Sequence, residues 1–128
     1  MTVLSEKEEA LASAIVKVAF AVHRAMGPGL LESIYEACFC YELKKHGIPH
    51  RRQAAVPLTY DGEPLSQVLR LDILVDDLIV YELKSIESMI AVFLAQILSQ
   101  LKLSGKHLGF LINFNVALIK HGIRRVII

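Results

Sequence analysis

Apolar residues recur every three or four positions in the first third of the chain, which predicts two consecutive helices. Ser5 and Glu8 have the spacing of a capping box, and the helix that they open should end at Gly27, where Gly-Pro-Gly interrupts the pattern. A second helix is expected from about residue 30 to residue 46, with Gly47 just beyond its end. The chain therefore begins with a helical pair.

The pattern then changes to short apolar and alternating runs, which predict three strands. Pro57 interrupts the first strand, residues 53–60, so this strand should lie at a sheet edge. The turn signal Asp-Gly at 61–62 separates it from the second strand, residues 65–75, and the third follows at 78–85. We expect these three strands to form an antiparallel meander.

A third helix is predicted over residues 88–103, and it is apolar on nearly all sides. We expect it to be buried against the sheet, with a partner subunit as a candidate for covering the rest. Its one narrow polar stripe consists of Gln96, Ser99 and Gln100. Two more strands follow at 108–114 and 123–128. Because a helix connects the third and fourth strands, that pair can be parallel, and the chain is assigned to the α/β class.

Composition adds limits to this picture. The 128 residues are 54% hydrophobic, which is typical of one folded domain, residues 1–128, around a single core. A formal charge of +1 gives no global attraction to nucleic acid or to a membrane, so such contacts would need local basic clusters, at 44–46 and 50–52. Without a signal peptide or a membrane-spanning run, the protein is expected to be cytoplasmic.

Candidate chemistry lies on the second and third strands. Alternation should place Arg70, Asp72 and Leu74 on one face, Leu71, Ile73 and Val75 on the other, and Val80, Glu82 and Lys84 together on the next strand. The register decides whether the acids meet, since a two-residue turn would put Asp72 opposite Tyr81. We predict a three-residue loop, which pairs apolar with apolar and puts Asp72 opposite Glu82: Leu74 faces Val80, Ile73 faces Tyr81 and Arg70 faces Lys84.

Two opposed carboxylates repel each other unless a cation lies between them. A hard divalent metal such as Mg²⁺ or Mn²⁺ prefers oxygen ligands and leaves positions for water and phosphate. A metal held by Asp72 and Glu82, with Lys84 beside it to neutralise charge, is what metal-dependent phosphodiester hydrolysis requires. From these three residues alone, a solvated sheet face with salt bridges is the commoner explanation.

Further motifs change that balance. Residues 29–35 fit the pattern G-x-x-E-x-x-Y through Gly29, Glu32 and Tyr35. With residues 81–84, 101–105 and 111–115, the chain from about Ile15 to its C-terminus resembles the GxxExxY protein family, which is placed in the PD-(D/E)xK nuclease-like superfamily. The resemblance implies a restriction-endonuclease-like αβββαβ core with an extra N-terminal helix, and a mixed central sheet flanked by helices.

The resemblance also implies roles. Asp72 and Glu82 would be the metal-binding acids, Lys84 the catalytic lysine, Glu32 an additional acid from the preceding helix, and Gln96 a polar residue beside the site. The chain departs from the family pattern on its third helix: a His-Glu pair commonly precedes the glutamine, where this chain has Phe93 and Leu94, and a tyrosine is usual at Gln100.

Three functions remain open. The first is a Mg²⁺- or Mn²⁺-dependent nuclease acting on DNA or RNA. The second is a catalytically altered fold that works as a dimeric interaction or nucleic-acid-binding module, with a homodimer formed through the apolar helix surface. The third is an enzyme acting on another phosphorylated molecule, for which the sequence offers no glycine-rich phosphate loop.

Overall fold

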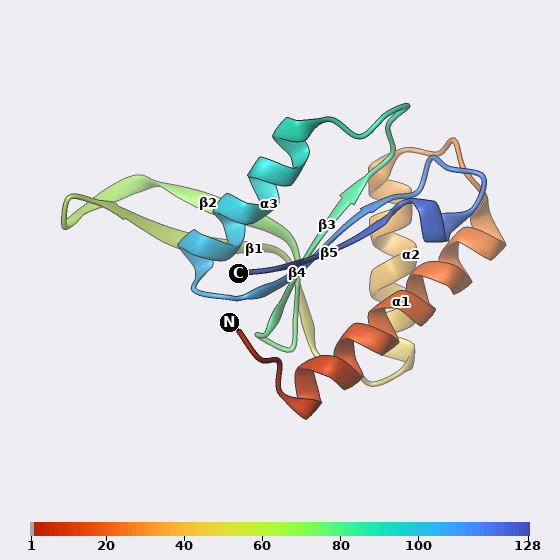
Figure 1. Cartoon of the computed structure of the whole chain (residues 1–128), viewed down its shortest axis with the longest axis horizontal. Helices are drawn as coiled ribbons and strands as arrows, with labels where there is room; N and C mark the ends of the chain where they lie inside the picture. Colours follow the sequence, from red (N-terminus) through yellow and green to blue (C-terminus); the bar gives the residue numbers. More distant parts are fainter. Residues whose placement is uncertain (1) are drawn as a thin grey trace.

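The computed structural model describes residues 2–128 and has the predicted element order (Figure 1). No helix within this range is both long and apolar enough to span a bilayer. The elements are α1 (Glu6–Met26), α2 (Glu32–Lys45), β1 (His50–Tyr60), β2 (Glu63–Val75), β3 (Ile79–Lys84), α3 (Ala91–Ser104), β4 (Leu108–Asn113), the 3-10 helix η1 (Ile119–His121) and β5 (Ile123–Ile127).

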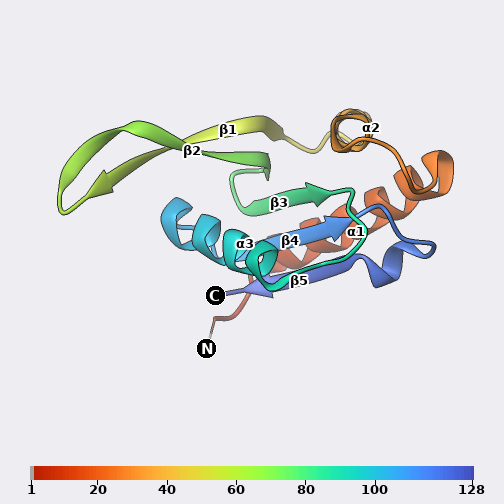
Figure 2. The same cartoon turned by 90° about the horizontal axis from the view of Figure 1, so that it is seen from above.

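The five strands form one mixed sheet in the order β1-β2-β3-β4-β5. All neighbours are antiparallel except β3 and β4, which are parallel because α3 carries the chain back between them. Helices α1 and α2 pack on one face of the sheet and α3 packs on the other (Figures 1 and 2). This confirms the predicted α/β architecture and is consistent with the restriction-endonuclease-like fold.

The loop between α1 and α2 is held by a side chain of α2. The hydroxyl of Tyr35 donates a hydrogen bond to the carbonyl of Gly27 over 2.6 Å and accepts one from the N–H of Leu30 over 3.1 Å. Gly29 within this loop has φ 91, which favours glycine. The helix therefore begins at Glu32, two residues later than predicted, and the tyrosine of the motif fixes where that glutamate is presented.

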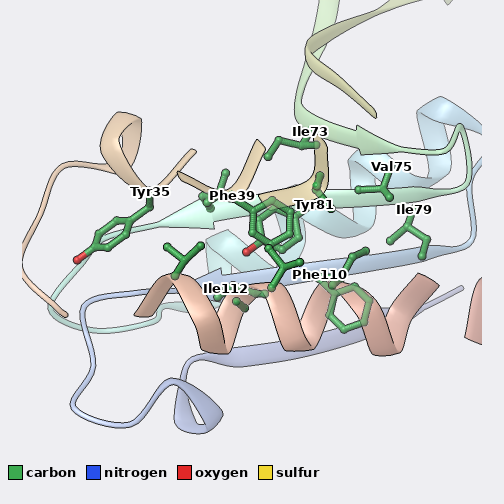
Figure 3. Close-up of a cluster of buried hydrophobic side chains, with 14 of the residues drawn as sticks. Tyr35, Phe39, Ile73, Val75, Ile79, Tyr81, Phe110 and Ile112 are labelled. Carbon is green, nitrogen blue, oxygen red and sulfur yellow. The ribbon is translucent and has the colours of Figure 1, made fainter. Parts of the chain in front are cut away.

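Aromatic stacking fixes α2 on the sheet. The ring of Phe39 lies 3.9 Å from that of Tyr81 on β3, and the ring of Tyr35 lies 4.5 Å from that of Phe114 (centroid distances). Figure 3 shows Phe39 and Tyr81 face to face inside the larger apolar cluster. Because Tyr81 directly precedes Glu82 in the chain, this packing sets α2 at a fixed distance from the candidate acids.

Helix α3 is less covered than its composition predicts. It begins at Ala91 rather than at residue 88, and its buried residues are Ile97, Gln100 and Leu101. Phe93 and Leu94 are partly buried, and several other apolar side chains of the helix are exposed, among them Val92, Leu98 and Leu103. The expectation of burial on several sides is therefore wrong for a single chain, since the sheet covers only one side of the helix.

Strand β2 changes faces at Asp72, which corrects the predicted alternation. Leu71 belongs to the cluster under α3, whereas Ile73 belongs to the cluster under α1 and α2. The residue facing this point on β1 is Gln53, whose φ of 48 is unusual for a side-chain-bearing residue. A distortion of the β1–β2 hairpin at this level turns the following side chains of β2 to the opposite face of the sheet, and the strand continues beyond it.

The β1–β2 hairpin continues past the sheet as a two-stranded arm (Figure 2). Its partner β3 pairs with β2 only from Ile73 to Val75. Arg70 therefore pairs with Ala55 of β1 and not, as predicted, with Lys84 of β3. The sheet opens between β2 and β3 beyond Ile73, and the candidate acids lie where it opens.

Candidate active site

The predicted register of β2 and β3 is confirmed for the apolar pairs, and the ladder ends one step before Asp72 and Glu82. Leu74 pairs with Val80 and Ile73 with Tyr81, which leaves a three-residue loop at 76–78. Asp76 and Asp77 in this loop have φ values of 49 and 56, a left-handed conformation that aspartate tolerates better than most residues. The loop length therefore brings Asp72 to the side of Glu82.

Asp72 replaces the next step of the ladder with its side chain. Its Oδ2 accepts a hydrogen bond from the backbone N–H of Leu83 over 3.0 Å. The carboxylate is thus anchored between the two strands at the level where their backbone pairing stops. A carboxylate fixed in this way needs little rearrangement to act as a ligand.

Both acids have raised pKa values. Burial is the largest cause for Asp72; the Leu83 N–H opposes it, and the charges of Glu36 and Glu32 add to it. Burial raises the pKa of Glu82 to about 7, and the charge of Asp72 is the second cause. Each carboxylate therefore disfavours the charge of the other, which is the electrostatic situation that a cation relieves.

Lys84 is restrained beside these acids. Its Nζ lies 3.9 Å from Oε1 of Glu82 and 4.6 Å from the centre of the Phe93 ring, and its side chain is only 14% exposed. Phe93 stands at a position where the resemblance led us to expect a polar residue. In this chain its ring provides a cation–π contact that holds the lysine ammonium near Glu82.

Glu32 is brought near the site without joining a ligand cluster. It is exposed at the first turn of α2, and its charge reaches Asp72. Among residues 2–128, no three His, Cys, Asp or Glu side chains come close enough together to hold a metal ion. Glu32 therefore does not form a three-acid centre with Asp72 and Glu82.

Glu36 is a neighbour of the site that the sequence interpretation missed. Its charge raises the pKa of Asp72 more strongly than the charge of Glu32 does. It is half-buried, and its Oε1 accepts from Nε of Arg52 over 3.2 Å and its Oε2 from Nε2 of Gln53 over 3.2 Å. The sequence did contain a signal for Glu36: it lies four residues after Glu32, which places both residues on one helix face.

Glu82 opens into a cleft of about 500 Å³ between the hairpin arm and α3, and Asp72 lies outside the lining of this cleft. Its wall includes Glu82, Lys84 and, from the arm, Leu69. Gln96 also lines this cleft, but it is exposed, while Gln100, one turn later, is buried and lowers the pKa of Glu82, which favours the ionised carboxylate. Sequence reasoning identified the polar stripe but selected Gln96 and left out Gln100.

The residues present fit a divalent cation. Asp72 and Glu82 supply hard oxygen donors, and Oε2 of Glu82 is buried without any hydrogen-bond partner. An ionised oxygen in that position is costly unless a positive charge or a donor faces it. Two neighbouring carboxylates, one of which has an unpartnered oxygen and lines a cleft, are the kind of oxygen donors that Mg²⁺ and Mn²⁺ use.

Comparison with known proteins agrees with this geometry. The family described as the PD-(D/E)XK nuclease superfamily matches residues 9–126, nearly the whole chain. Comparisons with curated proteins and with solved structures give no match. The match does not name the GxxExxY family, so that finer resemblance stays a prediction. The chain belongs to the PD-(D/E)XK nuclease superfamily.

Proposed function

We propose that this protein is a divalent-metal-dependent nuclease that hydrolyses phosphodiester bonds of DNA or RNA. The observation that carries the proposal is that the half-buried Asp72 lies beside the buried Glu82, which lines an open cleft together with Lys84. Membership of the nuclease superfamily supports the reaction class. It does not distinguish DNA from RNA.

Asp72 and Glu82 would hold Mg²⁺ or Mn²⁺. A cation bound there supplies Lewis acidity and positive charge for a phosphate that gains charge in the transition state. The two side chains contribute position: Asp72 is fixed by the Leu83 N–H, and Glu82 extends from β3 with one oxygen unpartnered. Because both carboxylates are shielded from water, their interaction with a cation is strengthened.

Lys84 would act on the substrate phosphate. Its ammonium group lines the cleft and is restrained by Glu82 on one side and Phe93 on the other. A restrained ammonium can neutralise a non-bridging phosphate oxygen or orient the attacking water without reorganising first. Gln96, exposed on the same wall, is positioned to contact the substrate, and Glu32 would contribute charge at the edge of the site.

A cleavage assay tests this function directly. The full chain is incubated with single- and double-stranded DNA and with RNA, in Mg²⁺, in Mn²⁺ and in chelator, beside Lys84→Ala. Lys102→Ala is the matched control, because Lys102 is an exposed lysine on α3. We expect metal-dependent cleavage that falls by about 100-fold or more in Lys84→Ala and is unchanged in Lys102→Ala. Cleavage equal in both variants, or none with any substrate, contradicts the proposal.

A second candidate function is a catalytically altered module that binds a second copy of the chain or nucleic acid. The exposed apolar side chains of α3, Val92, Leu98 and Leu103, favour it, because a monomer leaves them in contact with water. Light scattering and metal-free filter binding test this function. A monomer with no affinity for nucleic acid would eliminate it, whereas a dimer that cleaves nothing would favour it over the nuclease.

A further inference from the structure

Gln100 is an unusual residue for its surroundings. It lies on the sheet-facing side of α3 between the buried residues Ile97 and Leu101, and it is only 8% exposed. A buried amide has two donors and an acceptor to satisfy, and leaving them unpaired costs free energy. An apolar residue at this position would pack without that cost, so the glutamine calls for a reason.

The amide of Gln100 lies close to the candidate site. The Gln100 side chain faces the carboxylate of Glu82, which extends from β3 under the helix, and it favours the ionised form of that carboxylate by lowering its pKa. Two atoms of this pair are not satisfied: Oε1 of Gln100 and Oε2 of Glu82 are both buried, and neither has a hydrogen-bond partner. Both residues line the same cleft. Two unpaired acceptors in one place indicate that a group bringing positive charge or donor hydrogens belongs there.

A hydrated divalent cation supplies both. The cation itself satisfies a carboxylate oxygen, and the water molecules that Mg²⁺ retains are hydrogen-bond donors to nearby amide oxygens. Lys84 does not satisfy the unpartnered oxygen Oε2 of Glu82, because its Nζ lies 3.9 Å from the other oxygen, Oε1. The neighbouring residues of the polar stripe, Gln96 and Ser99, are exposed and can be satisfied by solvent.

We propose that Gln100 is a positioning residue of the metal site: its amide N–H holds the Glu82 carboxylate, and its amide oxygen accepts a hydrogen bond from water carried by the bound cation. This inference rests on the proposed function, because it assumes that Asp72 and Glu82 hold a metal. It gives Gln100 the role of orienting the metal ligand Glu82. Loss of such a residue commonly weakens metal binding by about 10- to 100-fold.

The test is Mn²⁺ binding to the full chain, measured by titration calorimetry without nucleic acid. Gln100→Met preserves the length of the side chain and removes its polar atoms. We expect it to weaken Mn²⁺ binding by about tenfold or more. Ser99→Ala, on the same helix and the same cleft wall, serves as the control and should bind like the wild type. Glu82→Gln should abolish binding and thereby identify the site.

A second readout separates positioning from a structural role. In metal-free protein, Gln100→Met removes an unpaired buried oxygen and also the amide N–H that faces Glu82; because these two changes oppose each other, its stability toward urea should be close to that of the wild type. A residue that only supports the fold would lower that stability on replacement. Weaker metal binding combined with undiminished metal-free stability is the result we expect.

The outcomes separate the two proposals. If the wild type binds Mn²⁺ through Glu82 and Gln100→Met binds equally well, Gln100 is not a positioning residue, and the metal site stands. If Gln96→Met weakens binding while Gln100→Met does not, the assignment belongs to the other glutamine. If the wild type binds no Mn²⁺, the metal site and the role of Gln100 both fail.

Discussion

Asp72 and Leu83 are joined by a side-chain-to-backbone hydrogen bond of 3.0 Å across the opening between β2 and β3. The bond stands where the next backbone pair of the ladder would be, one step beyond Ile73 and Tyr81. It fixes the carboxylate of the half-buried Asp72 beside the buried Glu82. The sheet therefore holds the site in position before a cation binds. The repulsion between the two carboxylates lowers the stability of the metal-free fold.

Asp72→Asn should make the metal-free protein more stable at neutral pH. The asparagine oxygen can still accept from the Leu83 N–H, while the charge that repels Glu82 is removed, so we expect a gain of roughly 1 kcal/mol. Urea unfolding in chelator measures it. Asp77→Asn, in the neighbouring loop, is the control and should change stability by less than about 0.5 kcal/mol. An Asp72→Asn protein less stable than the wild type would contradict this electrostatic account.

The metal-free protein should lose stability as pH rises through the range set by Glu82. Its pKa is raised from 4.5 to about 7 in the folded state, so the folded protein holds the proton more tightly than the unfolded chain. The stabilising contribution is full below about pH 4.5 and is lost as pH rises through 7, by up to about 3 kcal/mol. The raised pKa of Asp72 acts in the same direction.

Urea titrations at a series of pH values in chelator measure this dependence, and Glu82→Gln provides the control. The variant cannot titrate at this position, so its stability should fall less between pH 4.5 and 7 and exceed that of the wild type above pH 7. Identical pH profiles for the two proteins would show that Glu82 titrates at its ordinary value.

Tyr35→Phe should destabilise the protein through the loop that precedes Glu32. The substitution removes the hydroxyl that bridges the Gly27 carbonyl and the Leu30 N–H, and it leaves the ring stacked on Phe114. We expect a loss of about 1 to 3 kcal/mol in chemical unfolding. Tyr41→Phe removes a hydroxyl from a 66% exposed tyrosine of the same helix and should be neutral. Equal effects of the two substitutions would count against the bridge.

Phe93→Leu should slow cleavage by releasing Lys84. The ring lies 4.6 Å from the ammonium group, and a cation–π contact of this kind contributes about 1 kcal/mol, which corresponds to roughly fivefold in rate. Phe93→Tyr keeps the ring and should retain the rate. Steady-state cleavage of the preferred nucleic acid is the measurement, and a wild-type rate in Phe93→Leu would mean that the ring does not position the lysine.

Sequence reasoning predicted the parts of the structure that depend on local signals. The capping box at Ser5 and Glu8 is present, and the three-residue loop at 76–78 gives the predicted register of Ile73 with Tyr81. These features follow from neighbouring residues alone: cap chemistry, loop length, and the pairing of apolar positions. The order of strands and helices along the chain could be predicted for the same reason.

What the sequence did not reveal depends on contacts between distant segments. The change of face at Asp72 arises where β2 meets the distorted residue Gln53 of β1, and alternation alone cannot anticipate it. The choice between Gln96 and Gln100 depends on how α3 is rotated over β3. Gly109 on β4 contributes to that packing, since a side chain there would meet Ile97 at 3.0 Å.

The central claim is that Asp72 and Glu82 together hold a catalytic divalent cation, and anomalous diffraction from a crystal soaked in Mn²⁺ tests it most directly. The account predicts a manganese peak within ligand distance, about 2.0–2.6 Å, of a carboxylate oxygen from each of the two residues, and no such peak in Glu82→Gln. A peak elsewhere with the pair left empty, or no peak under conditions that support cleavage, would contradict it.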